Sequence, residues 1–204
     1  MPLVHEYLRY VPVRTDEHVT ADEVCVSGSD DEPASVDVQT TESKRKKLYL
    51  FSTTSIQTRF CLAFEMADHK DGFNATNLLK DTKKQAGKIP AVFISDGLPS
   101  YSAAHRAVFA AKNPLDKHSV HKRCLPQQQN NFQERFNGTF RRFQSRQHIS
   151  NPDSPLIMGF FVCYNHFSLH KRTPAAGIII HCDDEWKTII GNASLAARTK
   201  GARP

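Results

Sequence analysis

The stretch Ile89–Tyr101 reads IPAVFISDGLPSY, and it constrains the fold more strongly than any other part of the chain. Its first half, Ile89–Ser95, is a short apolar run typical of a buried strand, and the pair Asp96-Gly97 ends that strand. An Ala-rich segment, Ser100–Lys112, follows and is predicted to form a helix. Open α/β sheets place their ligand sites at the carboxyl ends of strands. Asp96 is therefore the first candidate site residue, with ordinary turn chemistry of an Asp-Gly pair as the alternative.

The segments on either side of this stretch predict a sheet covered by helices. Residues 18–27 alternate apolar and polar positions, as a half-buried strand does, whereas residues 28–43 are too poor in apolar side chains to fold and indicate a mobile insertion. In chain order we expect strands at 18–27, 47–51 and 59–65, a helix from the N-cap Asn74 to Gly87, a strand at 89–95, a helix at 100–112, a strand at 119–125, and helices at 130–147 and 155–169. The second and third strands are close enough in sequence to form a hairpin. This order predicts an α/β protein with a mixed sheet and helices on its faces.

Two further carboxylates are candidates to join Asp96. Asp22 lies inside the first strand, where either it or Glu23 faces inward, and an inward carboxylate needs a cation or hydrogen bonds to offset its desolvation. A charged residue on the solvent face is the alternative. Glu134 lies on a helix with a stripe of phenylalanines, which indicates core packing: Phe132, Phe136, Phe140 and Phe143. If Asp22, Asp96 and Glu134 converge, their hard oxygen ligands select Mg²⁺ or Mn²⁺, and two such ions serve phosphoryl displacement.

The composition is ordinary for a soluble globular protein: 204 residues, of which 39% are hydrophobic and 24% charged. No apolar run reaches the roughly 20 residues of a membrane span, and the first residues lack the apolar region of a secretory signal. Five scattered cysteines favour a reducing cytosol over a disulfide framework. The net charge of +6 is segregated, with basic clusters at 44–47, 118–123 and 135–146 and a mostly acidic or polar stretch at 20–43. Segregated positive charge is typical of a nucleic-acid binder.

Four motifs stand out: Thr20-Ala21-Asp22-Glu23, Thr58-Arg59-Phe60, Asp96-Gly97-Leu98-Pro99-Ser100-Tyr101 and the run from Asn130 to Thr139 around Glu134. Together they resemble the catalytic domain of DDE-type transposases, particularly the IS6-like group of insertion sequences, over roughly residues 18–192. The resemblance implies an RNase H-like α/β fold with a mixed five-stranded sheet, and a catalytic and metal-binding triad of Asp22, Asp96 and Glu134 with two Mg²⁺ or Mn²⁺ ions. It also implies cleavage of transposon ends and their transfer into target DNA by a homo-oligomer in the cytoplasm, at the nucleoid.

The resemblance divides the chain into a remnant of an N-terminal region at 1–17, a catalytic core at 18–170 with the polar insertion, and a C-terminal segment with a basic tail at 171–204. The region with which the family reads transposon ends has no counterpart, so we expect a truncated copy. Val19 stands where the family has tryptophan, and Ser55 where an aspartate is common. These departures favour a degenerate copy.

Three alternatives stay open beside a transposase: an RNase H-like nuclease, an inactive DNA-binding remnant and a zinc module. Phosphate contacts are expected from polar side chains of the Glu134 helix: Arg135, Asn137, Arg141, Arg142 and Arg146. The zinc module would use His118, His121 and Cys124, which are spaced three apart, with Cys163 and His166 to complete the site.

Overall fold

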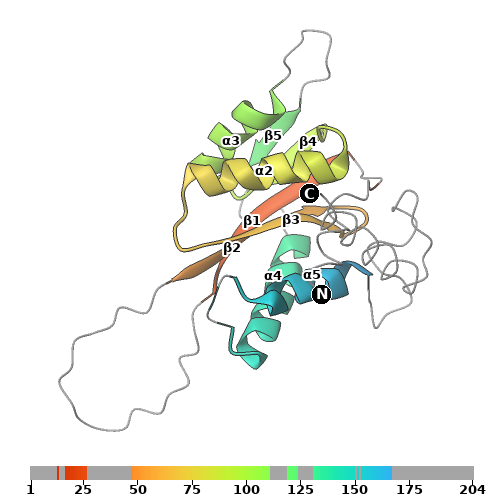
Figure 1. Cartoon of the computed structure of the whole chain (residues 1–204). Coiled ribbons are helices and arrows are strands. Elements are labelled where there is room, and N and C mark those ends of the chain that lie inside the picture. Colours follow the sequence, from red (N-terminus) through yellow and green to blue (C-terminus); the bar gives the residue numbers. More distant parts are fainter. Residues whose placement is uncertain are drawn as a thin grey trace, which may run out of the picture.

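The protein is a five-stranded mixed sheet with helices on both faces (Figure 1), seen in a computed structural model that describes residues 13, 17–26, 47–110, 119–123, 131–149, 151 and 153–166. The elements are β1 (His18–Val26), β2 (Leu48–Ser55), β3 (Cys61–Ala67), α2 (Gly72–Ala86), β4 (Val92–Ser95), α3 (Pro99–Phe109), β5 (Val120–Arg123), α4 (Asn131–Arg146) and α5 (Pro155–His166). The strands are ordered β3-β2-β1-β4-β5. The predicted α/β class and RNase H-like sheet are confirmed.

Strand β1 is the centre of the sheet. It pairs antiparallel with β2, which continues antiparallel into β3 as the predicted hairpin. On its other side β1 pairs parallel with β4, and β4 pairs parallel with β5. Parallel neighbours need crossover connections, and α3 provides the one between β4 and β5. The carboxyl end of β4 therefore lies beside the middle of β1.

The two faces of the sheet carry separate cores. On one face α2 and α3 pack over Val19 and Ala21 of β1, and on the other α4 and α5 pack over Val24 and Val26. Side chains of a strand alternate between faces, so odd positions of β1 meet α2 and α3 and even positions meet α4 and α5. The expectation of a half-buried first strand is thus wrong in one respect, because helices cover both of its faces.

The phenylalanine stripe of α4 belongs to the core, as predicted. Phe136 and Phe140 are fully buried, and their rings contact Phe160 and Phe161 of α5 at centroid separations of 5.1–6.1 Å. Such edge and stacked contacts add to the free energy of area burial. The rings of Phe136, Phe140 and Phe143 are therefore occupied by α5, whereas the half-buried ring of Phe132 is contacted by Arg59.

Several element boundaries differ from the prediction. Helix α2 begins at Gly72, and its N-cap is Asp71, whose side chain accepts a 2.9 Å hydrogen bond from the backbone N–H of Asn74. The predicted N-cap Asn74 is thus inside the helix, whereas Gly87 takes the left-handed conformation expected at the C-terminal end. Strand β2 runs four residues further than predicted, to Ser55. The polar stretch at 28–43 and the segment 171–204 lie outside the described residues.

Within the described part of the chain, no helix has the length and apolar character that crossing a membrane requires.

Candidate metal centre

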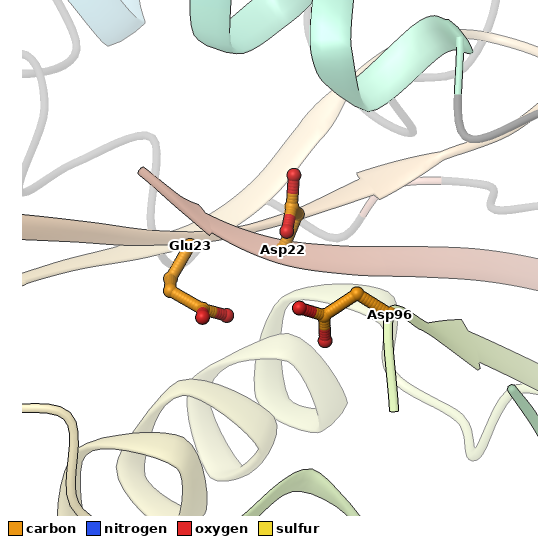
Figure 2. Close-up of side chains that lie close together, drawn as sticks. All are labelled: Asp22, Glu23 and Asp96. Carbon is orange, nitrogen blue, oxygen red and sulfur yellow. The ribbon is translucent and has the colours of Figure 1, made fainter. Parts of the chain in front are cut away.

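Asp22 and Asp96 meet because β1 and β4 are parallel neighbours. Their register pairs Ala21 with Ser95. Asp22 is the residue after Ala21 in β1, and Asp96 is the residue directly after Ser95, where β4 ends. Figure 2 shows Glu23 joining them, with its carboxylate turned toward that of Asp96. One carboxylate oxygen from each of the three residues lies within 4.8 Å of the others. Two of the three predicted carboxylates are therefore brought together, and Glu23, weighed in sequence as an alternative to Asp22, joins them.

Asp22 is held from the α4 side of the sheet by a buried amide. Asn137 Nδ2 donates a 2.8 Å hydrogen bond to Asp22 Oδ2, and one turn earlier Gln133 Nε2 donates a 2.6 Å bond to Ser52 Oγ on β2. Ser52 is the cross-strand partner of Asp22. Gln133 and Asn137 are four residues apart, so they share one helix face and dock α4 on two neighbouring strands. Gln133 was not predicted from the sequence as a functional residue. The signal that could have identified it is a polar residue that interrupts the buried face of α4.

Asp96 is both a turn residue and a member of the cluster. Its Oδ1 accepts a 3.1 Å hydrogen bond from the backbone N–H of Leu98, and Gly97 supplies the positive φ of 95° that the turn requires. Ser95 Oγ, one residue earlier, lies 2.9 Å from His121 Nε2 on β5. The turn thus aims the carboxylate of Asp96 at β1. The two interpretations of the Asp-Gly pair, as a turn and as a site residue, are therefore compatible.

Glu134 lies in the first turn of α4 and is exposed. It does not belong to the group of oxygens that approach within 4.8 Å of one another. Its charge nevertheless contributes to raising the pKa of Asp22. The third predicted carboxylate is therefore near the cluster and outside it.

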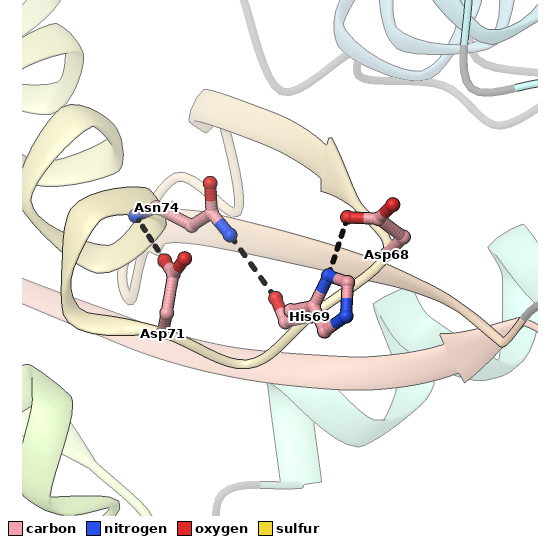
Figure 3. A network of polar contacts seen from close by, with 4 residues as sticks. All are labelled: Asp68, His69, Asp71 and Asn74. Carbon is pink, nitrogen blue, oxygen red and sulfur yellow. Dashed lines mark hydrogen bonds and ion pairs between the residues drawn. The ribbon is translucent and has the colours of Figure 1, made fainter.

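Glu23 points to the opposite face of the sheet from Asp22, as its odd position dictates. Its side chain is 4% exposed, and its Oε1 accepts a 2.8 Å bond from Lys70 Nζ. Lys70 lies in the turn between β3 and α2, which Figure 3 shows tied by polar contacts at Asp68, His69, Asp71 and Asn74. Lys70 also approaches the ring of Tyr49 to 5.1 Å. A fixed turn therefore holds one oxygen of Glu23.

The electrostatics of the cluster favour a cation. Burial raises the pKa of Asp22 from its usual 3.8 to about 7, and the negative charges of Glu23, Asp96 and Glu134 add to the rise. Glu23 Oε2 is buried and has no hydrogen-bond partner among the described residues. Buried carboxylates that repel one another are stabilised by an opposite charge, and an all-oxygen donor set suits a hard divalent ion. The residues present thus fit the Mg²⁺ or Mn²⁺ expected from the sequence.

The arginines of α4 lie on its outer side. Arg135, Arg141, Arg142 and Arg146 are all exposed, and at helical spacing Arg135, Arg142 and Arg146 share one stripe. Arg141 lies on the neighbouring stripe of the helix, which it shares with Glu134. Of these two residues, Glu134 is the one near the acidic cluster. Asn137 is different, because it is 6% exposed and its amide nitrogen is bonded to Asp22.

The described part of a zinc module does not assemble. His121 is on edge strand β5, where its ring nitrogens face Ser95 and Ser102, whereas His166 packs on Phe60 next to the opposite edge strand, β3. His118 and Cys124 lie outside the described residues. Among the described residues, the group with metal-ligand spacing is the carboxylate cluster.

Comparison with known proteins identifies the fold. No protein-family model matches the sequence, and no curated protein is significantly similar to it. The chain is similar to the HTLV-2 integrase catalytic core domain in complex with magnesium, at 11% identity and a TM-score of 0.52, over 80% of this chain and 96% of that one. It is similar to a chain of the simian T-cell lymphotropic virus intasome in complex with PP2A regulatory subunit B56 gamma, at 12% identity and a TM-score of 0.51, over 86% of this chain.

This chain spans 55% of the length of that intasome chain. A third likeness, to the Mos1 strand transfer complex, covers 100% of this chain and 59% of that one at 15% identity, but its TM-score of 0.42 carries no argument. At these identities the likeness concerns the fold. The chain has the RNase H-like fold of the integrase catalytic core domain.

Proposed function

We propose that this chain is the catalytic core of a DNA transposase, which cleaves DNA and joins the freed end to a target with the help of divalent metal ions. The observation that carries the proposal is the meeting of Asp22 and Asp96 across β1 and β4 of an RNase H-like sheet. The motifs around Asp96 and Glu134 support an IS6-like insertion-sequence transposase within this fold. The magnesium in the HTLV-2 integrase core supports Mg²⁺ or Mn²⁺ as the cofactor.

In this proposal Asp22 and Asp96 hold two ions, and Glu134 completes the ligand set from α4. When bound, such ions activate the attacking oxygen and stabilise the leaving one. Water attacks a phosphodiester first, so that a phosphorus–oxygen bond forms as the 3′-oxygen leaves. The freed 3′-hydroxyl then attacks a target phosphodiester, and the 3′-oxygen of the target strand leaves. Asn137 contributes by fixing Asp22, and the Gly97 turn by aiming Asp96.

We propose that DNA lies along the exposed side of α4. Arg135, Arg142 and Arg146 form a stripe there, and contacts from arginine to phosphate position DNA without reading its sequence. Arg141 lies two helical turns from Glu134 on the same stripe, and it is proposed to contact the same DNA backbone. A homo-oligomer is part of the proposal, since the HTLV-2 core is described in a trimeric form and the other neighbour is an intasome.

The test is a cleavage and strand-joining assay with Mn²⁺, with end-labelled short duplex DNA as donor and supercoiled plasmid as target. The natural chain is compared with Asp96→Asn, and with Glu17→Gln, which removes an exposed carboxylate next to β1. Nicked and joined products that vanish in Asp96→Asn and persist in Glu17→Gln support the proposal. Equal products from Asp96→Asn refute the site.

The same assay separates the alternatives. Nicked plasmid without joined products identifies an RNase H-like nuclease, because the first attack then occurs without the second. Retained DNA affinity with no product of either kind identifies an inactive DNA-binding remnant.

A further inference from the structure

Several buried polar atoms have no hydrogen-bond partner among the described residues. Two of them, Glu23 Oε2 and the hydroxyl of Tyr101, belong to residues that interact with the acidic cluster. Tyr101 is a fully buried residue of the first turn of α3, and Glu23 exposes 4% of its side chain. Leaving a buried polar atom unpaired is unfavourable, and more so when the atom is charged. Each of these two atoms therefore calls for a partner that the described residues do not supply.

The Tyr101 hydroxyl is related to the cluster by electrostatics, and Glu23 by the position of its carboxylate. Burial, followed by the negative charges of Glu23, Asp22 and Asp96, raises the pKa of Tyr101 well above its usual value. The hydroxyl is therefore within electrostatic reach of all three carboxylates of the cluster. Among these charges Glu23 has the largest effect, and its Oε1 already forms a 2.8 Å ion pair with Lys70 Nζ. Its free Oε2 and the Tyr101 hydroxyl thus belong to the side of the cluster that faces away from α4.

A hydrated divalent cation satisfies both atoms at once. The three carboxylate oxygens within 4.8 Å of one another are close to the spacing of ligands around Mg²⁺, where oxygens about 2.1 Å from the ion are about 3 Å apart when adjacent and about 4.2 Å when opposite. Small side-chain rotations suffice to close that gap. Mg²⁺ usually keeps several of its waters, and a buried hydroxyl is a suitable partner for one of them.

We propose that Glu23 is a metal ligand: with Asp22 and Asp96 it holds one Mg²⁺ or Mn²⁺, and the Tyr101 hydroxyl hydrogen-bonds to the hydration shell of that ion. The inference rests on the proposed function, and it assigns to this ion a ligand that the predicted triad lacks. Lys70 is a positioning residue, because it holds Oε1 and leaves Oε2 directed at the cluster. Glu134 is not needed for this ion, since its carboxylate lies outside the group of close oxygens.

The test measures Mn²⁺ affinity from the electron paramagnetic resonance signal of free Mn²⁺, in titrations of the natural chain and of single variants. Glu23→Gln keeps the size of the side chain and an acceptor for Lys70, and we expect it to weaken the tightest site at least tenfold. Tyr101→Phe removes the hydroxyl alone, and we expect a loss of about tenfold, as for other partners of metal-bound groups. Glu17→Gln is the control, because it removes an equal charge at an exposed position just before β1. We expect it to change the affinity of this site less than threefold.

The outcomes separate the inference from the proposed function. Natural affinity in Glu23→Gln refutes Glu23 as a ligand, and equal losses in Glu23→Gln and Glu17→Gln reduce its role to long-range charge. Both outcomes leave the proposed function standing. A natural chain that binds no Mn²⁺ at millimolar concentration overturns the inference and the proposed function together. Near-ultraviolet circular dichroism establishes whether each variant is folded. If Glu23→Gln does not fold, the Mn²⁺ affinity of Tyr101→Phe tests the inference in its place.

Discussion

Replacing Asp22 with asparagine should stabilise the metal-free protein at pH 8. The pKa of Asp22 is raised from 3.8 to about 7, so the folded chain binds this proton more tightly than the unfolded chain. The stability gained from that proton is fully present below pH 3.8 and is lost as the pH rises through about 7. An asparagine mimics the protonated carboxyl and avoids the loss, and its amide oxygen still accepts the hydrogen bond from Asn137.

The magnitude follows from the shift. About three pKa units at 1.36 kcal/mol each give a gain of about 4 kcal/mol for Asp22→Asn at pH 8, and about 2 kcal/mol at pH 5, where the unfolded chain is mostly ionised. For a domain of this size the gain at pH 8 corresponds to a rise in Tm of roughly 8–16 °C.

Urea unfolding in the presence of a chelator, at pH 5 and pH 8, measures both values. Glu17→Gln is the control for loss of an exposed carboxylate at the start of the same strand, and it should change little at either pH. Saturating Mg²⁺ should reduce the difference in the free energy of unfolding between the variant and the natural chain at pH 8, because it stabilises the natural chain and not the variant. A destabilised Asp22→Asn at pH 8, or equal gains at both pH values, would show that Asp22 carries no electrostatic strain and refute the reasoning.

Three further predictions concern parts of the structure away from this cluster. Burial lowers the pKa of His166 to about 4, so the natural chain should lose about 3 kcal/mol relative to His166→Phe as the pH falls from 6.5 to 4, in paired urea titrations. The Asn165 side chain bonds both the N–H and the C=O of Cys61 at 2.9 Å; Asn165→Leu should therefore reduce the free energy of unfolding by about 2–5 kcal/mol, measured at constant pH. Replacing Arg142 and Arg146 together with glutamine should weaken binding to duplex DNA of any sequence and reduce the salt slope by about 2, in fluorescence anisotropy.

The sheet was predictable because its signals are local. Strands β1 to β4 had an apolar run or alternation, whereas the signal of β5 was weak, and the pair Asp96-Gly97 marked the end of β4 where it is found. Strand β2 was underestimated because its second half is polar and yet buried, with Thr53 hydrogen-bonded at 2.7 Å to Thr82 of α2. A polar half-strand offers neither the apolar run nor the alternation by which the other strands were recognised. The start of α2 was missed for a related reason, since Gly72 is a poor helix former and hides a helix that Asp71 begins.

The cluster was only partly predictable because it depends on tertiary register. Asp22 and Asp96 carried motif signals, but the meeting of their carboxylates requires β1 and β4 to pair in one register, with Ala21 beside Ser95. Glu23 was a candidate only as an alternative to Asp22, because alternation sends neighbouring strand residues to opposite faces. The choice between Asp22 and Glu23 is not exclusive here, because both carboxylates approach Asp96. They do so from the two sides of β1.

This two-sided arrangement gives the two helical layers different roles around the carboxylate cluster. The turn that leads into α2 supplies Lys70, which holds Glu23. The α4 layer is attached to the strands beneath it by the amides of Gln133 and Asn137, and Asn137 holds Asp22. Neighbouring carboxylates of one strand are therefore fixed by different layers, so a substitution of Asn137 should loosen Asp22 and leave the ion pair between Lys70 and Glu23 intact.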